Sequence, residues 1–210
     1  NAIRTDYKRV PEQVIHRMHK MIKTTTLPKF CRKINSIDEI NNYFTVNLTN
    51  RYERVRIIGD IHGCYTALQQ AITPWDEKTL YIFCGDYLER GIENKEMIYE
   101  MMRLSTLPNT IMLEGNHERH IANFAFNTNL DHSKRFMKEV VAPIVKDMTK
   151  KDVESLQREL RLFYKSLRQC YPFSFHGKKY LVSHAGLSYV PNMTFIATST
   201  FINGFGAYET

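Results

Sequence analysis

The sequence has 210 residues, of which 43% are hydrophobic and 24% are charged, and its net charge is +7. This composition is ordinary for a soluble globular protein with one sizeable core. No apolar run reaches the roughly 18 to 20 residues of a membrane-spanning helix, and no secretory signal opens the chain. The four cysteines are widely spaced and form no CxxC pair, which favours reduced thiols in the cytoplasm over a disulfide framework or a zinc site.

Charge is distributed unevenly along the chain. Residues 1–56 carry 12 basic and 5 acidic side chains, residues 57–126 carry 5 and 10, and residues 127–170 carry 10 and 6. An acidic middle between basic flanks suits a cation-binding site that receives a phosphate-rich substrate. Basic helices can equally be solvated faces, so charge alone leaves both interpretations open.

The first fifty residues predict short helices. Apolar residues at helical spacing predict a helix over residues 9–23, with Pro11 in its first turn. Ser36 and Glu39 stand at the spacing of a capping box, which predicts a second short helix that starts at Ser36. We therefore expect an N-terminal helical segment over residues 1–50 and a main domain over residues 51–210.

From Arg54 onward, strands and helices are predicted to alternate. The runs VRIIGD, TLYIFCGD and TIMLEGN are short and apolar, and helical stretches follow them at residues 66–72, at 93–104 and from about 117. This alternation predicts βαβ units and a mainly parallel sheet, hence an α/β fold. Beyond it, residues 133–168 predict two helices separated near 143–149, and residues 173–184 predict a hairpin that turns at Gly177.

Each predicted strand ends in residues that can bind a metal. The first three strand ends are Gly59-Asp60-Ile61-His62-Gly63, Gly85-Asp86 and Gly115-Asn116-His117-Glu118, and a fourth strand ends at His184. In open α/β sheets, ligands bind beyond the carboxyl ends of the strands, so we expect these side chains to meet at one sheet edge. Carboxylate, amide oxygen and imidazole together suit manganese, iron or zinc.

The motifs GDIHGC, GDYLERG, GNHER and SHAGL resemble the ordered signatures of the calcineurin-like metallophosphoesterases, in the form of the phosphoprotein phosphatase branch. The resemblance covers roughly residues 54–190. It implies a fold of mixed β sheets flanked by helices, a helical insert or cap at about residues 127–170, and two bound divalent metal ions, manganese before iron, zinc or nickel.

The resemblance also implies roles for individual residues. Asp60 and His62 would bind the first metal, Asp86 would bridge both metals, and Asn116 and His184 would bind the second. His117 would be the general acid, and Glu89 would support it. Arg90 would bind the phosphate, and Arg119 would be a further substrate contact. Glu89 stands where the family usually has aspartate. The histidines His120 and His132 are predicted to lie at the surface.

One expected metal ligand is missing from the sequence. The family has a further histidine late in the chain, and none follows His184. We therefore expect a polypeptide that is truncated at its C-terminus, with a weakened second metal site. A scaffold with the fold but without the chemistry is the alternative.

The substrate is predicted from the N-terminal phrase TDYKRVPEQVIHRMHK. It resembles the kinase tail that precedes the phosphatase in bacterial and phage polynucleotide kinase-phosphatases. The resemblance implies an upstream kinase domain and removal of 3′ or 2′,3′-cyclic phosphate from nucleic-acid ends in RNA or DNA repair. A protein Ser/Thr phosphatase and a dinucleoside polyphosphate hydrolase stay open. The candidate backbone contacts in the insert are Lys134, Arg135, Lys138, Arg158, Arg161 and Arg168.

Overall fold

The computed structural model describes residues 11–24, 36, 39, 42, 44–187 and 197–204. The chain divides into two compact units, Asn1–Glu39 and Ile40–Thr210. The part of the kinase-tail phrase that precedes Pro11, and the residues that flank Ser36 and Glu39, lie outside the described residues. Across the part of the chain that is described, no helix is both long enough and apolar enough to cross a bilayer.

The N-terminal unit contains helix α1, Glu12–Thr24, and confirms the helix predicted in this region. Val14, Ile15, Met18 and Met21 are exposed on it. Further along, the backbone N–H of Glu39 donates to Ser36 Oγ at 3.1 Å, which is one half of the predicted capping box.

The larger unit begins with a parallel sheet. Its strands are β2 (Arg54–Ile58), β3 (Thr79–Phe83) and β4 (Thr110–Met112), in the order β2-β3-β4. Each strand is followed by a helix: α3 (Tyr65–Ile72), α4 (Asn94–Ser105) and α5 (Glu118–Phe126). The predicted βαβ alternation is therefore confirmed.

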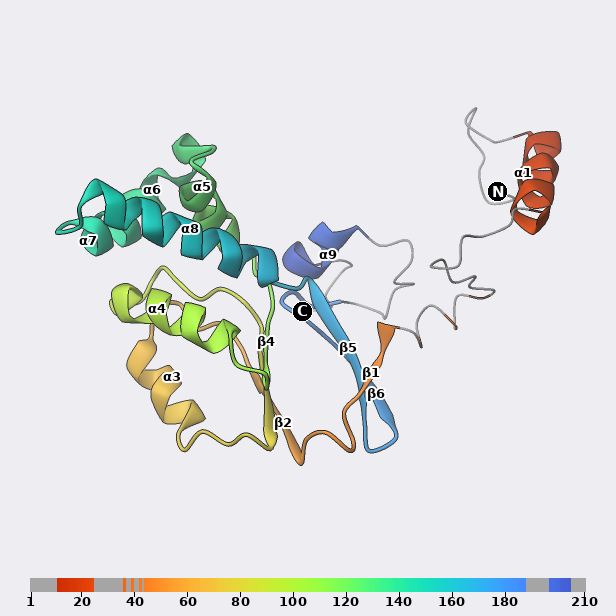
Figure 1. Cartoon of the computed structure of the whole chain (residues 1–210), viewed down its shortest axis with the longest axis horizontal. Helices are drawn as coiled ribbons and strands as arrows, with labels where there is room; N and C mark the ends of the chain where they lie inside the picture. The colour runs from red at the N-terminus through yellow and green to blue at the C-terminus, as the bar shows by residue number, and fades with distance from the viewer. Residues whose placement is uncertain are drawn as a thin grey trace, which may run out of the picture. The chain divides into compact units, whose positions relative to one another are not determined.

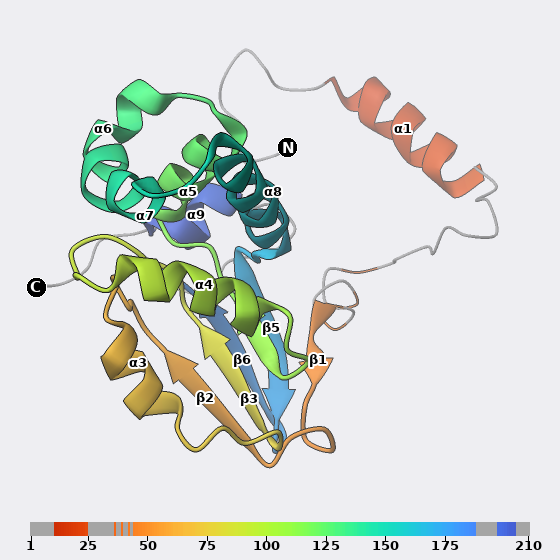
Figure 2. The same ribbon diagram turned by 60° about the vertical axis from the view of Figure 1, so that its left-hand side comes forward.

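A second sheet packs on the face of the first sheet that helices α3 and α4 do not cover (Figures 1 and 2). It contains β1 (Val46–Asn47), β5 (Cys170–Phe175) and β6 (Lys178–Ser183) in the order β1-β5-β6, with β1 parallel and β6 antiparallel to β5. The predicted hairpin is confirmed, with His176 and Gly177 both at positive φ in its turn. Strand β1 was not predicted, because two residues carry no periodic signal.

Two hydrophobic cores meet at β3. One lies between the first sheet and the helices and contains Tyr81 and Phe83, and the other lies between the two sheets and contains Leu80 and Ile82. All five residues of β3 are buried, because side chains from both faces of this central strand enter a core.

The helical insert forms a cap, which we define as residues 130–166. In Figure 2 the cap helices gather beyond the end at which β2 and β3 terminate. Its elements are η1 (Leu130–Ser133), α6 (Lys134–Phe136), the π-helical turn η2 (Met137–Val141), α7 (Ala142–Val145) and α8 (Lys150–Ser166).

The cap agrees with the two predicted helices in outline and differs in detail. The first is a composite of short elements, and Pro143 lies inside it rather than at its end. Proline is tolerated there because it stands in the first turn of α7, directly after the π-helical turn. The second helix, α8, starts with a capping box between Thr149 and Asp152. A last helix, α9 (Thr198–Asn203), packs Phe201 into the unit.

Candidate metal centre

The predicted metal ligands come together at the strand ends. Asp60 and His62 follow β2, Asp86 follows β3 and Asn116 follows β4, as expected for a parallel sheet. The expectation of one sheet edge is wrong for His184, because this residue follows β6 of the second sheet. The site therefore lies where the ends of the two packed sheets meet.

The loops between these strands and helices, residues 59–63, 85–91 and 115–118, are called the motif loops below. Seven non-glycine residues in the described part of the chain have positive φ, and four of them are His62, Asp86, Glu89 and Arg90. Such conformations cost on the order of 1 kcal/mol or more each and persist only where the surroundings enforce them. Here the enforcing contacts include the N–H groups of Ile61 and His62, which donate to the carbonyl oxygen of Asp86 at 3.1 and 2.9 Å.

His62 presents a free lone pair to two carboxylates. Its Nδ1 lies 3.1 Å from the carbonyl oxygen of Leu88, so Nδ1 carries the proton and donates it there. Its Nε2 lies 3.8 Å from Asp60 Oδ2 and 3.6 Å from Asp86 Oδ2. Among the buried side-chain atoms that the structure describes, this Nε2 lacks a hydrogen-bond partner. A buried acceptor between carboxylates fits a bound cation.

His184 repeats this arrangement on the other side of Asp86. Its Nδ1 donates to the carbonyl oxygen of Cys84 at 3.0 Å, so its Nε2 also carries a lone pair. That Nε2 lies 3.0 Å from Asn116 Oδ1 and 3.6 Å from Asp86 Oδ1. Asp60 is near both histidines, with its Oδ1 3.7 Å from His184 Nδ1. Acceptors that face one another without a proton between them again fit a cation, and Asp86 offers one oxygen to each side.

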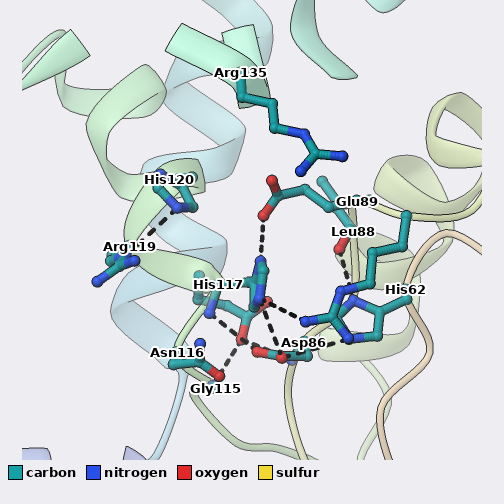
Figure 3. A network of polar contacts seen from close by, with 12 residues as sticks. His62, Asp86, Leu88, Glu89, Gly115, Asn116, His117, Arg119, His120 and Arg135 are labelled. Atoms are coloured by element: carbon teal, nitrogen blue, oxygen red, sulfur yellow. Dashed lines mark hydrogen bonds and ion pairs between the residues drawn. The ribbon is translucent and has the colours of Figure 1, made fainter. Parts of the chain in front are cut away.

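Glu89 and His117 form a second group beside the Asp86 carboxylate (Figure 3), and Arg90 contacts His117. His117 Nδ1 forms an ion pair with the Glu89 carboxylate, so the longer side chain of glutamate still reaches the histidine. Arg90 Nη2 lies 3.3 Å from His117 Nε2, and that Nε2 lies 3.8 Å from Asp86 Oδ2. The backbone N–H of His117 donates to Asp86 Oδ1 at 3.0 Å.

Sequence reasoning gave no role to Glu118, which is fully buried beneath the motif loops. Its carboxylate accepts N–H donations from Asp86 at 2.8 Å, Gly115 at 2.6 Å and Tyr87 at 3.1 Å. Burial raises the pKa of Glu118 to about 7, against the opposite effect of these three donors. The signal in the sequence was the glutamate that directly follows Gly115-Asn116-His117 in the motif GNHER.

Arg119 and His120 lie on α5 beside this group. Arg119 is exposed, and its Nε lies 3.4 Å from His120 Nε2. The surface placement predicted for His120 is wrong, because its ring is partly buried, stacks on Phe136 at a centroid distance of 5.8 Å and has Nδ1 2.8 Å from Ser133 Oγ. His132 is exposed, as predicted.

Comparison with known proteins gives consistent findings. Residues 53–208 match the family described as calcineurin-like phosphoesterase. Serine/threonine-protein phosphatase 2 of Salmonella typhimurium is 31% identical over 150 residues, which cover 70% of this chain and 64% of that protein. The serine/threonine-protein phosphatase PP2A-like PPG1 of Candida albicans is 28% identical over 126 residues, which cover 57% of this chain and 29% of that protein.

Among solved structures, a protein serine/threonine phosphatase from Saccharomyces cerevisiae matches with 17% identity and a TM-score of 0.41, covering 92% of this chain and 59% of that one. The chain thus spans less than two thirds of the length of each of these three proteins.

Proposed function

The chain belongs to the calcineurin-like phosphoesterase family, and from this premise we propose that it hydrolyses phosphate monoesters with the help of two divalent metal ions. The observation that carries the proposal is the buried, unpartnered Nε2 of His62 opposite the carboxylates of Asp60 and Asp86. Such an atom is costly in an apolar or anionic setting and favourable beside a cation.

In this proposal, Asp60, His62 and Asp86 hold the first metal, and Asp86, Asn116 and His184 hold the second. The mixed nitrogen and oxygen donors support manganese as the working ion, and iron, zinc and nickel suit the same donor types. When bound, such a metal pair activates water for in-line attack and neutralises charge on the phosphoryl oxygens. The carbonyl oxygens of Leu88 and Cys84 fix the two histidine rings so that Nε2 faces inward.

The neighbouring group supplies the rest of the chemistry. Arg90 is exposed, and its planar guanidinium can bind two phosphoryl oxygens at once. In its protonated form, His117 carries the proton for the leaving oxygen of the ester on Nε2, the nitrogen that faces Asp86 Oδ2. The Glu89 carboxylate accepts a hydrogen bond from His117 Nδ1–H and thereby keeps the ring oriented.

Phosphoserine or phosphothreonine in a peptide is the first candidate substrate. It is supported by the names of the two curated relatives, which are both serine/threonine phosphatases. The side chain of Asp60 is 51% exposed, and Arg90 is exposed, so a phosphate on a flexible peptide can reach the proposed metal ligands.

A 3′ or 2′,3′-cyclic phosphate at a nucleic-acid end is the second candidate, favoured by the basic cap. Lys134, Arg135, Lys138 and Arg158 are exposed and can contact a phosphate backbone, although Lys134 pairs with Asp131 at 3.1 Å and Arg135 with Glu139 at 2.8 Å. Two other basic residues make contacts inside the unit. Arg161 donates to the carbonyl oxygen of Ala125 at 2.6 Å, and Arg168 lies 5.5 Å from the ring centre of Tyr171.

The experiment is phosphate release with added manganese, measured in parallel on a phosphoserine peptide and a 3′-phosphorylated RNA oligonucleotide. We expect release from the peptide and its loss in His117→Ala. Release mainly from RNA would reverse the order of the two substrates. Absence of release from both, together with no manganese binding by calorimetry, would refute the proposed function.

A further inference from the structure

The longer side chain at position 89 raises the question of what holds its carboxylate beside His117. Glutamate has one more rotatable bond than aspartate, so it reaches His117 from more conformations and orients it less tightly. Figure 3 shows the Glu89 carboxylate between His117 on one side and the guanidinium of Arg135 on the other. A further hydrogen-bond donor beside this carboxylate would favour the conformation that serves His117.

We propose that His120 is a positioning residue, which donates its Nε2–H toward the Glu89 carboxylate and so fixes the orientation of His117. A nitrogen of His120, a carboxylate oxygen of Glu89 and a ring nitrogen of His117 all lie within 4.8 Å of one another. The inference rests on the proposed function for its consequence in catalysis, but its structural part stands separately.

The tautomer of His120 follows from Ser133. This serine is 1% exposed, and its Oγ accepts from Asn123 Nδ2 at 2.9 Å and lies 2.8 Å from His120 Nδ1. If Nδ1 carried the proton, the buried hydroxyl of Ser133 could no longer donate to it, and an unsatisfied buried donor is unfavourable. The hydroxyl therefore donates to Nδ1, and the ring proton lies on Nε2.

Arg119 is the competing contact. Its Nε lies 3.4 Å from His120 Nε2 and would favour the other tautomer. That distance is at the long limit of a hydrogen bond, and exposed Arg119 can donate to water instead. Satisfaction of the buried serine outweighs a long contact at the surface. Burial also lowers the pKa of His120, which favours the neutral form of its ring.

A third metal ion is the other occupant that two histidines and a glutamate suggest. The surrounding charge opposes it. Arg90 approaches His117 Nε2 at 3.3 Å, Arg119 approaches His120 Nε2, and the positive end of the α5 dipole begins at His117. These positive groups favour an anion over a metal ion at this position. In the proposal, the Glu89 carboxylate therefore interacts with His117 and His120 and not with a third metal ion.

The first test is independent of activity. In ¹⁵N-labelled protein at pH 8, long-range correlation spectra should show the His120 proton on Nε2 and the His117 proton on Nδ1. His120→Phe keeps the stacking on Phe136 and should shift the proton of His117 away from Nδ1. A proton on Nδ1 of His120, or a His117 signal that does not respond to the substitution, would overturn the proposal. His132→Phe is the matched control at an exposed histidine.

The second test uses the leaving group. Loss of orientation at the proton donor should lower kcat about 10- to 100-fold for an alkyl phosphate, whose leaving oxygen needs a proton, and much less for p-nitrophenyl phosphate. Equal losses on both substrates would indicate a merely structural role. His120→Gln, whose amide N–H can reach toward Glu89, should recover part of the activity, and it serves as the second variant if the phenylalanine variant fails to fold.

Substitution at position 89 completes the test. Aspartate is too short to reach both histidines, so in a Glu89→Asp background His120→Phe should have no additional effect on the His117 spectrum. An unchanged effect of His120→Phe in that background would contradict a pathway through Glu89. If the wild-type protein released no phosphate at all, the proposed function would fail, and the spectra would still decide the role of His120.

Discussion

The motif loops and the cap are adjacent in the molecule, yet different interactions hold them. In the motif loops, backbone carbonyl and N–H groups fix residues with positive φ, and a buried carboxylate, Glu118, ties three N–H groups together. In the cap, buried apolar side chains such as Val140, Ile144, Leu156 and Leu160 pack against the helices below. Hydrogen bonds to the backbone therefore fix the conformation of the motif loops, and apolar packing stabilises the cap.

This difference separates two consequences of substitution. A conservative change in a loop alters the positions of functional atoms and leaves most buried apolar area intact. A change in the cap core removes dispersion contacts and hydrophobic burial, but leaves the loop hydrogen bonds in place. Activity and stability should thus respond to different residues, and the predictions below test that separation.

Asp86→Asn should give the largest effect, because it removes the charge that faces both histidines. We expect kcat/KM to fall by about 10²–10³-fold and manganese affinity to fall with it. The free energy of unfolding of the metal-free protein should not decrease, because asparagine can still accept the N–H of His117. Calorimetry with manganese and urea unfolding measure the two quantities. If the free energy of unfolding fell together with manganese affinity, the proposed separation between residues for activity and residues for stability would be wrong.

Leu160→Ala tests the cap from the opposite side. Leu160 is completely buried, so its truncation should lower the free energy of unfolding by about 2–5 kcal/mol. Manganese affinity of the folded protein should stay unchanged. Leu162→Ala is the control on the same helix, because Leu162 is 70% exposed and should tolerate the change. Urea midpoints for both variants, with calorimetry below the transition, provide the comparison.

Gly91→Ala should affect both quantities. A Cβ on Gly91 would lie well inside van der Waals contact with the carbonyl oxygens of His62 and Gly63, so the loop must shift. We expect about 1–3 kcal/mol of destabilisation and weaker manganese binding. Gly59→Ala is the matched control, because no atom lies within 4 Å of its added Cβ. Equal thermal unfolding midpoints for the two variants would contradict this prediction. They would show that the loop can shift to accept the added Cβ without a loss of stability.

Asp76→Asn should give the smallest effect. Asp76 lies just before β3, at the end of the strand that is opposite the motif loops. Hydrogen bonds from Thr79 and Arg54 lower the pKa of Asp76 to about 2. A carboxylate with a lowered pKa stabilises the fold above its unfolded pKa of about 4, and this stabilisation is lost as pH falls toward 2. The variant should therefore be slightly less stable than wild type at pH 7, and the difference should shrink below pH 4. Urea midpoints at pH 7, 5 and 3.5 would test this, and a constant difference would contradict it.

Much of the first sheet was predictable because its signals are local. An apolar run that ends in glycine and aspartate marks β3 and Asp86 together, and the same holds for β2 with Asp60 and β4 with Asn116. The metal-ligand candidates could therefore be named from the sequence alone. His184 was assigned to the correct end of a strand and to the wrong sheet, since strand partners are not encoded locally.

The residues that sequence reasoning missed act through distant partners. Glu118 matters because Asp86 and Tyr87, about thirty residues earlier, present their N–H groups to it. His120 on α5 is held by Ser133 in the next element and lies near Glu89, which belongs to a separate loop. The π-helical turn before Pro143 likewise depends on how the cap packs, so periodicity alone indicated a simple helix.

Strand β3 has one further consequence. It forms the wall that the two hydrophobic cores share, and it ends three residues before Asp86. A substitution that changes the volume of a side chain in one core can shift β3 and thereby disturb packing in the other core. Substitutions in the two cores should therefore be energetically coupled. Asp86 follows a strand that is buried on both faces, and the amides of β3 should be among the last to exchange with deuterium.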